Sequence, residues 1–211
     1  MTAASDDDLA IASLLTTGWL AAHHAVGEMA QWAPRTSQAL SLLKWESPLL
    51  DAVRAGMELM DEQADELTAP LRLAAGAWLG HTNPRTWSES VLRTHLLCGA
   101  LLDLIELTAD TWPQSSRKLL HQDPSGALVK TLTEVLDHVV ADEREVSRLG
   151  LFGRRLAAEA TAQAQRVAAN RPELAGALTN HEVGSLDELN TTTQLLADLV
   201  EKGAQRMLSL G

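Results

Sequence analysis

The stretch Asn83–Asp110, NPRTWSESVLRTHLLCGALLDLIELTAD, decides the fold. Asn83 suits a helix N-cap, and Pro84 falls at the first helical position, where a missing N–H costs nothing. From Leu96 to Ile105 a helix would be apolar on almost every side, with Asp103 as the one acid. Because a helix that is apolar all round is surrounded by other helices, this stretch predicts the central helix of an all-α bundle.

The composition fits an all-α fold of moderate size. The chain has 211 residues, which is enough for one substantial hydrophobic core. Ala and Leu are abundant, no stretch alternates as a strand does, and Pro and Gly fall mostly between helical patterns. We therefore expect residues 1–211 to form a single helical-bundle domain.

Charge and cysteine content narrow the classes of partner. The formal net charge is −11, with 17 basic against 28 acidic residues. Tight nucleic-acid binding needs clustered Lys and Arg, and the sequence has no long basic run, so a nucleic-acid partner is disfavoured. The single cysteine, Cys98, excludes an internal disulfide and a metal site built from several thiolates.

The chain carries no signal for export or membrane insertion. Its first residues, MTAASDDD, are acidic and lack the pattern of a signal peptide. No uninterrupted apolar run approaches the roughly 20 residues that a membrane span needs. We expect a cytoplasmic protein without a membrane partner.

Capping signals predict the first and the last helix. Ser5 and Asp8 have capping-box spacing for a helix from about residue 6 to residue 32. Ser185 and Glu188 have the same spacing before the last helix. The inner face of that last helix is predicted from apolar residues at helical spacing: Leu189, Leu196, Val200 and Met207.

Proline and glycine complicate the boundaries between these two helices. The region 36–67 contains Pro48, where either the helix kinks or Ser47 caps a new segment. The other predictions are a connection at 68–82, a short helix at 113–121, a helical run at 124–169 with a bend or break near Gly150 and Gly153, and a loop at 170–184.

Four long helices around an apolar centre suggest a test for a di-iron carboxylate site. Such a site takes a Glu from each of two helices and a Glu-x-x-His motif from each of the other two. The motif needs an acid three residues before a histidine. None of the seven histidines has one: His23, His24, His81, His95, His121, His138 and His181. The usual ligand motif is therefore absent.

Two acids nevertheless fall at apolar positions. Asp103 lies inside the central apolar run, and Asp142 continues an apolar stripe of the helical run that follows. An unpaired buried carboxylate is costly. Each acid is therefore held by a salt bridge or a hydrogen bond, for example to Arg or His of a neighbouring helix, or lies at an edge open to water, or is the remnant of an altered metal site.

Four segments occur in an order that resembles a known family. They are TWSESVLRTHLLCGALLDLIELTAD, LTEVLDHVVADEREVSRL, FGRRLAAEATAQAQRVAA and a closing helix that ends QRMLSLG. The chain resembles the actinobacterial ferritin-like proteins related to the tRNA hydroxylase that acts on a hypermodified adenosine, the MiaE-like family. The resemblance covers almost the whole chain and implies a ferritin-like four-helix bundle with additional C-terminal helices, whose active members are di-iron enzymes.

The resemblance also implies where ligands of the first two core helices would lie. The glutamate of the first helix falls at Trp19. The Glu-x-x-His motif of the second helix falls on Glu46 and Leu49, so its histidine is missing.

The other two core helices also depart from the family pattern. The acid-bearing stretch of the central helix corresponds to Cys98–Asp103 and keeps only Asp103. The family's Ala-Asp-x-x-His stretch corresponds to residues 141–145, which keeps Asp142 and puts Glu145 in place of histidine. Both histidine ligands and one carboxylate are replaced, which implies degenerate di-iron ligands and weak iron binding.

Three functional hypotheses follow, of which we favour the first. In the first, the scaffold has lost the metal site and serves as a non-catalytic binding or interaction protein without a cofactor, as a homodimer or with a protein partner. In the second, the chain is a metal-dependent oxidase or hydroxylase that binds iron through Glu46, Asp103, Asp142 and Glu145. In the third, the old site binds a small apolar ligand in a cavity lined by Trp19, Leu49 and Cys98.

Overall fold

The computed structural model describes residues 4–140 and 143–208 and confirms the all-α prediction, since these residues contain helices and no strand. The helices are α1 (Asp6–Gln31), α2 (Thr36–Leu43), α3 (Glu46–Met60), α4 (Ala64–His81), α5 (Trp87–Thr108), α6 (Gln114–Leu119), α7 (Ser125–Val139), α8 (Glu143–Asn170), α9 (Pro172–Thr179) and α10 (Leu186–Leu208). Short 3-10 turns occupy Asp61–Gln63, Ala109–Thr111 and Leu120–Gln122.

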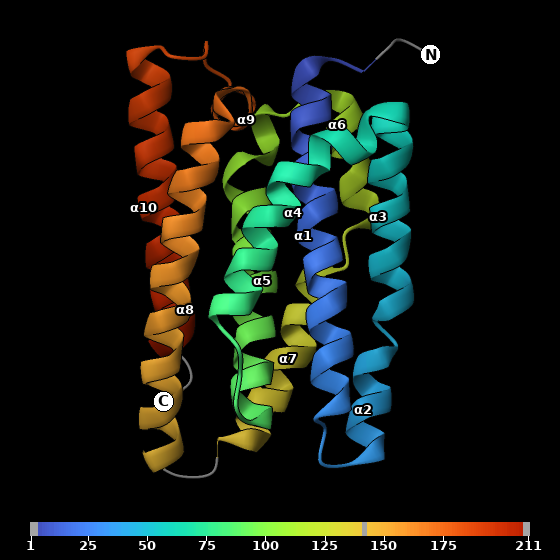
Figure 1. Cartoon of the computed structure of the whole chain (residues 1–211), viewed down its shortest axis with the longest axis vertical. Helices are drawn as coiled ribbons and strands as arrows, with labels where there is room; N and C mark the ends of the chain where they lie inside the picture. The colour runs from blue at the N-terminus through green and yellow to red at the C-terminus, as the bar shows by residue number, and fades with distance from the viewer. Residues whose placement is uncertain (1–3, 141–142, 209–211) are drawn as a thin grey trace.

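Two antiparallel helix pairs, α1–α3 and α5–α7, meet through the packing of α1 against α5 (Figure 1). Helix α4 lies across α1 and also packs on α8. Helices α8 and α10 stand side by side at the left of Figure 1, where α10 packs on both α5 and α8. The additional C-terminal helices therefore form a layer beside the two pairs.

One continuous hydrophobic core joins these helices. Its fully buried side chains come from α1, α2, α3, α5 and α7 and include Trp19, Met29, Leu42, Leu49, Leu92, Leu128 and Leu132. Phe152 and Leu156 of α8 belong to the same cluster. The central helix α5 is buried along most of its length, as the apolar run predicted.

The predicted caps of the first and last helices are confirmed. At α1, the Ser5 hydroxyl accepts a hydrogen bond from the Asp8 N–H, and the Asp8 carboxylate accepts one from the Ser5 N–H. At α10, the Ser185 hydroxyl accepts from the Glu188 N–H at 3.1 Å. These signals are local in sequence, and at α1 a tertiary contact adds to them, because the Ser116 N–H and hydroxyl also donate to the Asp8 carboxylate.

The start of α5 differs from the prediction. Thr86, not Asn83, is its N-cap, because the Thr86 hydroxyl accepts from the Glu89 N–H. The Glu89 carboxylate accepts in turn from the Arg85 N–H at 2.6 Å. This reciprocal pair outweighs the Asn83–Pro84 signal and moves the start three residues along the chain.

The helix around Pro48 is broken before the proline. Helix α2 ends at Leu43 and α3 begins at Glu46, with Trp45 at the N-cap position. Pro48 is thus the third residue of α3, where its missing N–H has no partner to lose. Of the two predicted outcomes, a new segment is correct, although Ser47 does not cap it.

Three predictions for the middle of the chain are wrong. Residues 68–82 mostly belong to α4, which continues through Pro70 and the exposed Gly76. Helix α8 runs unbroken through Gly150 and Gly153, and the end of α7 at Val139 is where the helical run is interrupted. Position 153 needs a glycine, although it lies inside a helix, because the Met207 side chain occupies the space where a β-carbon would be. The predicted loop after α8 contains α9.

The predicted inner face of α10 is wrong in part, because Met207 packs against the core and Gly153 but Leu189 and Val200 face solvent. Leu189 is 55% exposed and Val200 is 46% exposed, whereas Lys202 and Arg206 on another side of the helix contact α5. The apolar spacing is real, but ion pairs to α5 set the rotation of the helix. An apolar part of α10 consequently faces solvent.

Helix α1 is long and apolar enough to cross a membrane by length and composition alone, although its sequence contains no uninterrupted apolar run of that length. In the structure, 67% of its apolar window is buried inside the bundle. Such burial is what a core helix shows, because α1 packs on α3, α4 and α5.

Candidate functional site

The residues expected to line an old site at the centre of the bundle are packed into the core. Trp19, Leu49 and Cys98 are all buried there. The Trp19 indole N–H donates to the Asp123 carboxylate at 2.8 Å, which satisfies the one polar atom that this side chain brings inside. Burial, and then the charge of Asp123, raises the pKa of the Cys98 thiol to about 12. Two grooves, described below, are lined by other residues.

Asp103 pairs with cations of α10. Its side chain is 2% exposed, and the Arg206 guanidinium donates to both carboxylate oxygens, with Nε to Oδ2 at 3.1 Å. The Lys202 ammonium lies 3.7 Å from Oδ1. Gly99, one turn earlier on α5, leaves room for the guanidinium, since a β-carbon there would lie 2.7 Å from Arg206 Nε. The alternative in which Asp103 pairs with a neighbouring cation is therefore the one that the structure shows.

Glu145 ties the start of α8 to the start of α5. It accepts hydrogen bonds from the Ser88 hydroxyl and from Arg148, the latter at 2.6 Å. Arg148 also donates to the hydroxyls of Thr86 and Ser88, at 2.9 and 2.8 Å. Ser88 and Asp103 are 15 positions apart on α5, which corresponds to about 22 Å along the helix. The structure therefore does not bring Glu145 and Asp103 together.

The other two candidate ligands do not complete a site with them. Glu46 is the first residue of α3, and its Oε1 lies 3.4 Å from where a β-carbon of Gly27 on α1 would be. Asp142 lies outside the described residues. Among residues 4–140 and 143–208, no group of three or more His, Cys, Asp or Glu side chains is placed to hold a metal ion. The described residues do not fit a di-iron centre.

His95 is the buried histidine nearest to the Asp103 pair. It is almost fully buried on α5, and its Nδ1 has no hydrogen-bond partner among the described atoms. Burial, and then the positive charge of Arg206, lowers its pKa to about 4. The ring is therefore neutral at ordinary pH and supplies no charge to the Asp103–Arg206 pair.

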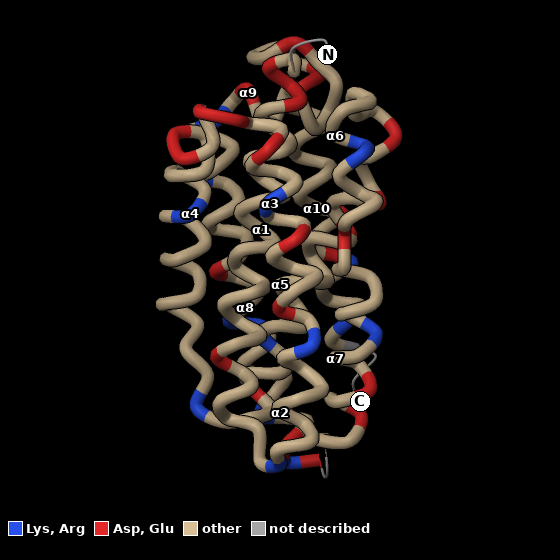
Figure 2. Tube along the Cα trace, turned by 90° about the vertical axis from the view of Figure 1, so that its right-hand side faces the viewer, with Lys and Arg blue, Asp and Glu red and all other residues tan. Residues whose placement is uncertain are grey.

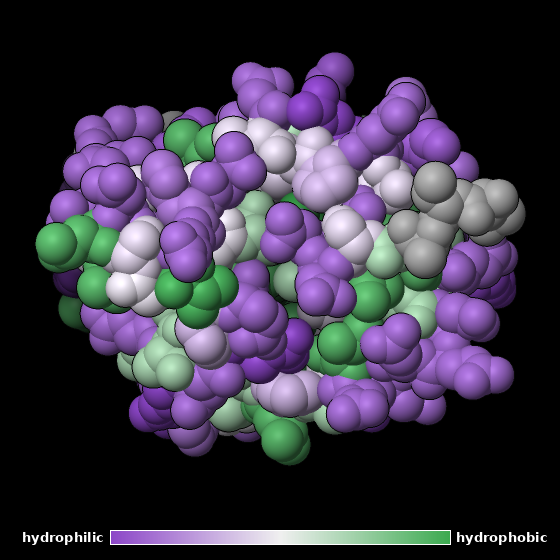
Figure 3. Space-filling view, turned by 90° about the horizontal axis from the view of Figure 1, so that it is seen from above, coloured by the Kyte–Doolittle hydropathy of each residue, from purple (hydrophilic) through white to green (hydrophobic). Residues whose placement is uncertain are grey.

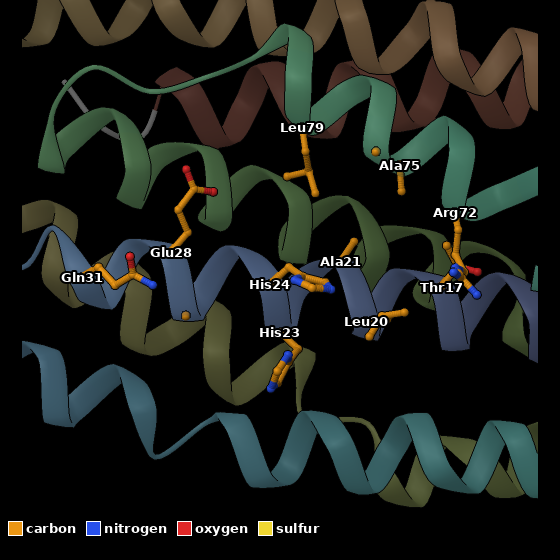
Figure 4. Close-up of a pocket in the computed structure, with 12 residues that line it drawn as sticks. Thr17, Leu20, Ala21, His23, His24, Glu28, Gln31, Arg72, Ala75 and Leu79 are labelled. Atoms are coloured by element: carbon orange, nitrogen blue, oxygen red, sulfur yellow. The ribbon is translucent and has the colours of Figure 1, made fainter. Parts of the chain in front are cut away.

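A groove of about 570 Å³ lies between α1 and α4 (Figure 4). Figure 4 shows Ala75 and Leu79 directed into it from α4, and His24 lying along α1. Glu28 is at one end and points towards α5, where the fully buried Arg93 donates to its carboxylate at 2.5 Å. Arg72 and Thr17 are at the other end. The groove thus has a middle lined by small and apolar side chains together with His23 and His24, between two charged ends.

A second, smaller groove of about 250 Å³ lies between α4 and α8, lined in part by Leu73, Val167 and Arg171. The sequence predicted neither groove, because both depend on how α4 packs, and 68–82 was expected to be a connection. Arg93, Lys202 and Arg206 were also missed as structural partners. The one indication of such cations in the sequence was the acid Asp103 at an apolar position, which needs a partner when buried.

The charge distribution agrees with the composition. Figure 2 shows many acidic residues at the end of the molecule where α1 begins, whereas Lys and Arg are scattered in short segments along the trace. Tight binding of a phosphate backbone draws on clustered Lys and Arg, and the sequence has 17 basic against 28 acidic residues.

Comparison with protein families gives a match over most of the chain. A model described as the ferritin-like domain of actinomycetes matches residues 5–181. No curated protein matches the chain. The matched region includes α1 to α9 and ends before α10.

Proposed function

The chain belongs to the ferritin-like domain family of actinomycetes, and from this premise we propose that it is a non-catalytic binding or interaction protein that has lost di-iron chemistry. The observation that carries the proposal is the state of Asp103. This acid is the one that the family resemblance places on the central helix, and Arg206 and Lys202 neutralise it. Iron would have to displace a two-point guanidinium contact to reach it.

Two further observations support the proposal. The positions that correspond to the family's first-helix glutamate and second-helix histidine are Trp19 and Leu49, and both are buried in the core. Glu145 is occupied by Ser88 and Arg148 at the far end of α5. A hydroxylase that uses Glu46, Asp103, Asp142 and Glu145 would need these carboxylates within a few ångströms of one another.

The finer relationship is part of the same proposal. We place the chain with the tRNA hydroxylase-like, MiaE-like branch on the order of its four helical segments, and the net charge of −11 argues against a tRNA substrate. The role that remains is binding. The groove between α1 and α4 and the exposed apolar residues of the surface provide places for it.

Metal content measured by mass spectrometry tests the proposal. The protein is purified without chelator and measured before and after loading with iron and with manganese. We expect less than about a tenth of an equivalent per chain, against about two for an intact di-iron site. An Asp103→Asn variant treated in the same way is the control for adventitious binding at this acid. About two equivalents in the wild-type chain, lost in this variant, would overturn the proposal.

A further inference from the structure

Two segments of the chain are strongly basic although the whole chain is acidic. Residues 67–88 and 146–172 together contain seven arginines, no lysine and one acid, Glu159, so their formal charge is +6. The rest of the chain contains 10 basic and 27 acidic residues and has a formal charge of −17. The first segment forms most of α4 and the turn into α5, and the second forms most of α8. Much of the positive charge is therefore concentrated on two helices.

Helices α4 and α8 bring these segments together on one side of the molecule, which we call the α4–α8 face. The two helices pack against each other, and both are drawn in front of α5 and α10 in Figure 1. In Figure 2, α4 runs along the left edge of the molecule, where the trace below its acidic start is tan and blue. Figure 3 shows apolar side chains in green among hydrophilic ones, seen from above. The basic face is assembled by packing, since its two segments are distant in the sequence.

Most arginines of the α4–α8 face are available to a partner. Within the described part of the chain, the guanidinium groups of Arg85, Arg154 and Arg166 form no hydrogen bond or salt bridge. The one acid is occupied by its neighbours, because the Glu159 carboxylate accepts from Gln163 Nε2 at 2.7 Å and lies 2.9 Å from His81 Nδ1. Five of the seven arginines are exposed: Arg72, Arg85, Arg154, Arg155 and Arg166. The face therefore presents more positive charge than its own acid can neutralise.

Uncharged side chains lie between these arginines. Leu73 is 77% exposed and Leu151 is 64% exposed. Many of the other uncharged positions that face solvent are small: Ala69, Gly76, Gly80, Ala157, Ala158 and Ala169. Small side chains let another surface come close, and leucines among cations are typical of a surface that enters the interface of a bilayer.

A recess between the two helices combines both kinds of side chain. The groove of about 250 Å³ between α4 and α8 is lined by Arg166 and Arg171 together with Leu73 and Val167. Arg171 already donates to the Leu67 carbonyl at 3.0 Å, so Arg166 is the cation with uncommitted donors. A phospholipid presents the complementary combination, a phosphate above an acyl chain. Guanidinium groups bind phosphate oxygens through two parallel N–H donors, and the apolar side chains can contact the upper part of the chain.

We propose that the α4–α8 face binds the surface of a membrane that contains anionic phospholipids. The arginines extend along α8 from Arg148 to Arg171, which corresponds to about 34 Å. Charge spread over this length on two helices matches a broad anionic surface, to which each arginine adds attraction without needing a particular partner atom. Leu73 and Leu151 enter the headgroup region. Contact with a membrane surface needs no helix that crosses it, so α1 stays in the core, and the proposal replaces the expectation of no membrane partner.

Two other anionic partners fit the α4–α8 face less well. Single-stranded RNA binds through bases that stack on aromatic side chains, but Trp78 and Phe152 of this face are buried. A phosphate backbone also gains nothing from exposed leucines. An acidic helix of a partner protein would lie along one groove, which leaves Arg154 on the outer side of α8 without a contact. A lipid surface uses the arginines and the leucines together.

The acidic remainder of the chain orients the molecule on the membrane. At physiological ionic strength, charges interact over about 8 Å, whereas a single helix with its side chains is already about 10 Å wide. Acids on the far side of the bundle are therefore largely screened from the membrane, but the arginines at the contact are not. Because the attraction is electrostatic, binding weakens as the salt concentration rises.

Co-sedimentation of the full chain with lipid vesicles tests the proposal. We expect binding to vesicles of mixed phosphatidylcholine and phosphatidylglycerol, weaker in high salt, and little binding to vesicles of phosphatidylcholine alone. The double variant Arg154→Gln/Arg166→Gln should bind the anionic vesicles at least about tenfold more weakly. Lys118→Gln/Lys130→Gln is the matched control, since it removes the same charge at exposed lysines of α6 and α7, and it leaves binding unchanged.

Three results would overturn the proposal. They are no binding to the anionic vesicles, equal binding to both kinds of vesicle, and equal effects of the two double variants. Circular dichroism establishes that both variants fold, so that a loss of binding is not a loss of structure.

Insertion of the leucines provides an independent readout. The variant Leu73→Cys is labelled with a dye whose emission depends on polarity, and Leu40→Cys on α2, where Leu40 is 63% exposed, is the control. Cys98 is buried, so the introduced thiol reacts first. We expect anionic vesicles to shift the emission of the Leu73→Cys conjugate to the blue and to leave the Leu40→Cys conjugate unchanged. Equal shifts, or no shift in the first conjugate, would contradict the assigned face.

Competition with RNA tests the identity of the occupant. Single-stranded RNA of mixed sequence should leave the vesicle-bound fraction unchanged. Displacement of the protein from vesicles by RNA, with RNA binding that Arg154→Gln/Arg166→Gln abolishes, would overturn the membrane as the occupant. A di-iron enzyme could carry the same face, so the proposal does not rest on loss of the metal site. None of these outcomes depends on metal content, so this proposal and the proposed function can fail separately.

Discussion

Leu101 and Asp103 lie two residues apart on α5, and the packing around them differs in kind. Leu101 faces α1, with its Cδ1 3.0 Å from where a β-carbon of Gly18 would be. Asp103 faces α10 and binds Arg206 and Lys202. The apolar side excludes water without selecting a single rotation of its neighbour, whereas the ionic side requires particular atoms to meet. The difference explains why α10 is fixed in a rotation that leaves apolar residues exposed.

The largest effect is expected on the apolar side. Leu92 is fully buried on α5, and Leu92→Ala removes buried methyl groups and leaves a cavity. We expect the free energy of unfolding to fall by about 3 kcal/mol, measured by urea denaturation. The exposed Leu73→Ala is the control and should change it by less than about 0.5 kcal/mol. A small effect of Leu92→Ala would mean that the neighbouring helices close the space.

His95 lies between α7 and the Arg206 side chain of α10, and we expect it to make the free energy of unfolding depend on pH. Its ring is packed against the Val129 backbone of α7, and burial together with Arg206 lowers its pKa from 6.5 to about 4. The unfolded chain takes up a proton as pH falls below 6.5, but the folded chain does not until about pH 4. The contribution of His95 to the free energy of unfolding is therefore fully present above pH 6.5 and falls by roughly 3 kcal/mol towards pH 4.

Denaturation midpoints measured between pH 7 and pH 4 test this dependence. The variant His95→Gln, which cannot titrate, should lack most of the slope in this range. An unchanged slope in the variant would assign the pH dependence to other groups.

Breaking the ionic side should have a smaller and more local effect. Asp103→Asn removes the charge that holds Arg206, but the guanidinium is partly exposed and can turn to solvent. We expect a loss of about 2 kcal/mol, less than for a fully buried pair. Hydrogen exchange should rise mainly in α10. Exchange that rises equally in α1 and α3 would show that the ionic contact supports the whole bundle.

The smallest effect on global stability is expected from Gly99→Ala, at the glycine that makes room for Arg206. In Gly99→Ala the new β-carbon would lie 2.7 Å from Arg206 Nε, so the arginine must shift. A helical Gly→Ala change otherwise stabilises by about 0.5–1 kcal/mol. We expect these effects nearly to cancel in global stability while α10 exchanges faster. Gly76→Ala, which has nothing within 4 Å, should show the gain alone.

The sequence predicts most of the fold because its strongest signals are local. The capping boxes at Ser5 and Ser185 and the apolar run of α5 depend on residues within a few positions of one another. Helix α4 was mistaken for a connection because Pro70 and two surface glycines resemble breaks, although each is tolerated where it lies.

The candidate site is harder to predict because its decisive contacts are distant in the chain. The sequence indicates that Asp103 needs a partner, but Arg206 is 103 residues away and reaches it only once α10 has docked. The same holds for Glu28 and Arg93, which are 65 residues apart. The outward face of α10 follows from such a pair, so apolar spacing alone assigned Leu189 and Val200 to the wrong side.

The burial of α1 has a consequence for synthesis of the protein. This helix is apolar enough to cross a membrane, and its final partners include α9, which ends at Thr179. At roughly 5–20 residues per second, α9 leaves the ribosome about 7–30 s after α1. For that time the nascent chain presents an apolar helix that has not found all its neighbours. Chaperones and membrane-targeting factors would compete for this helix. Pairing with α3, the first of its large partners to be made, would bury part of its apolar surface.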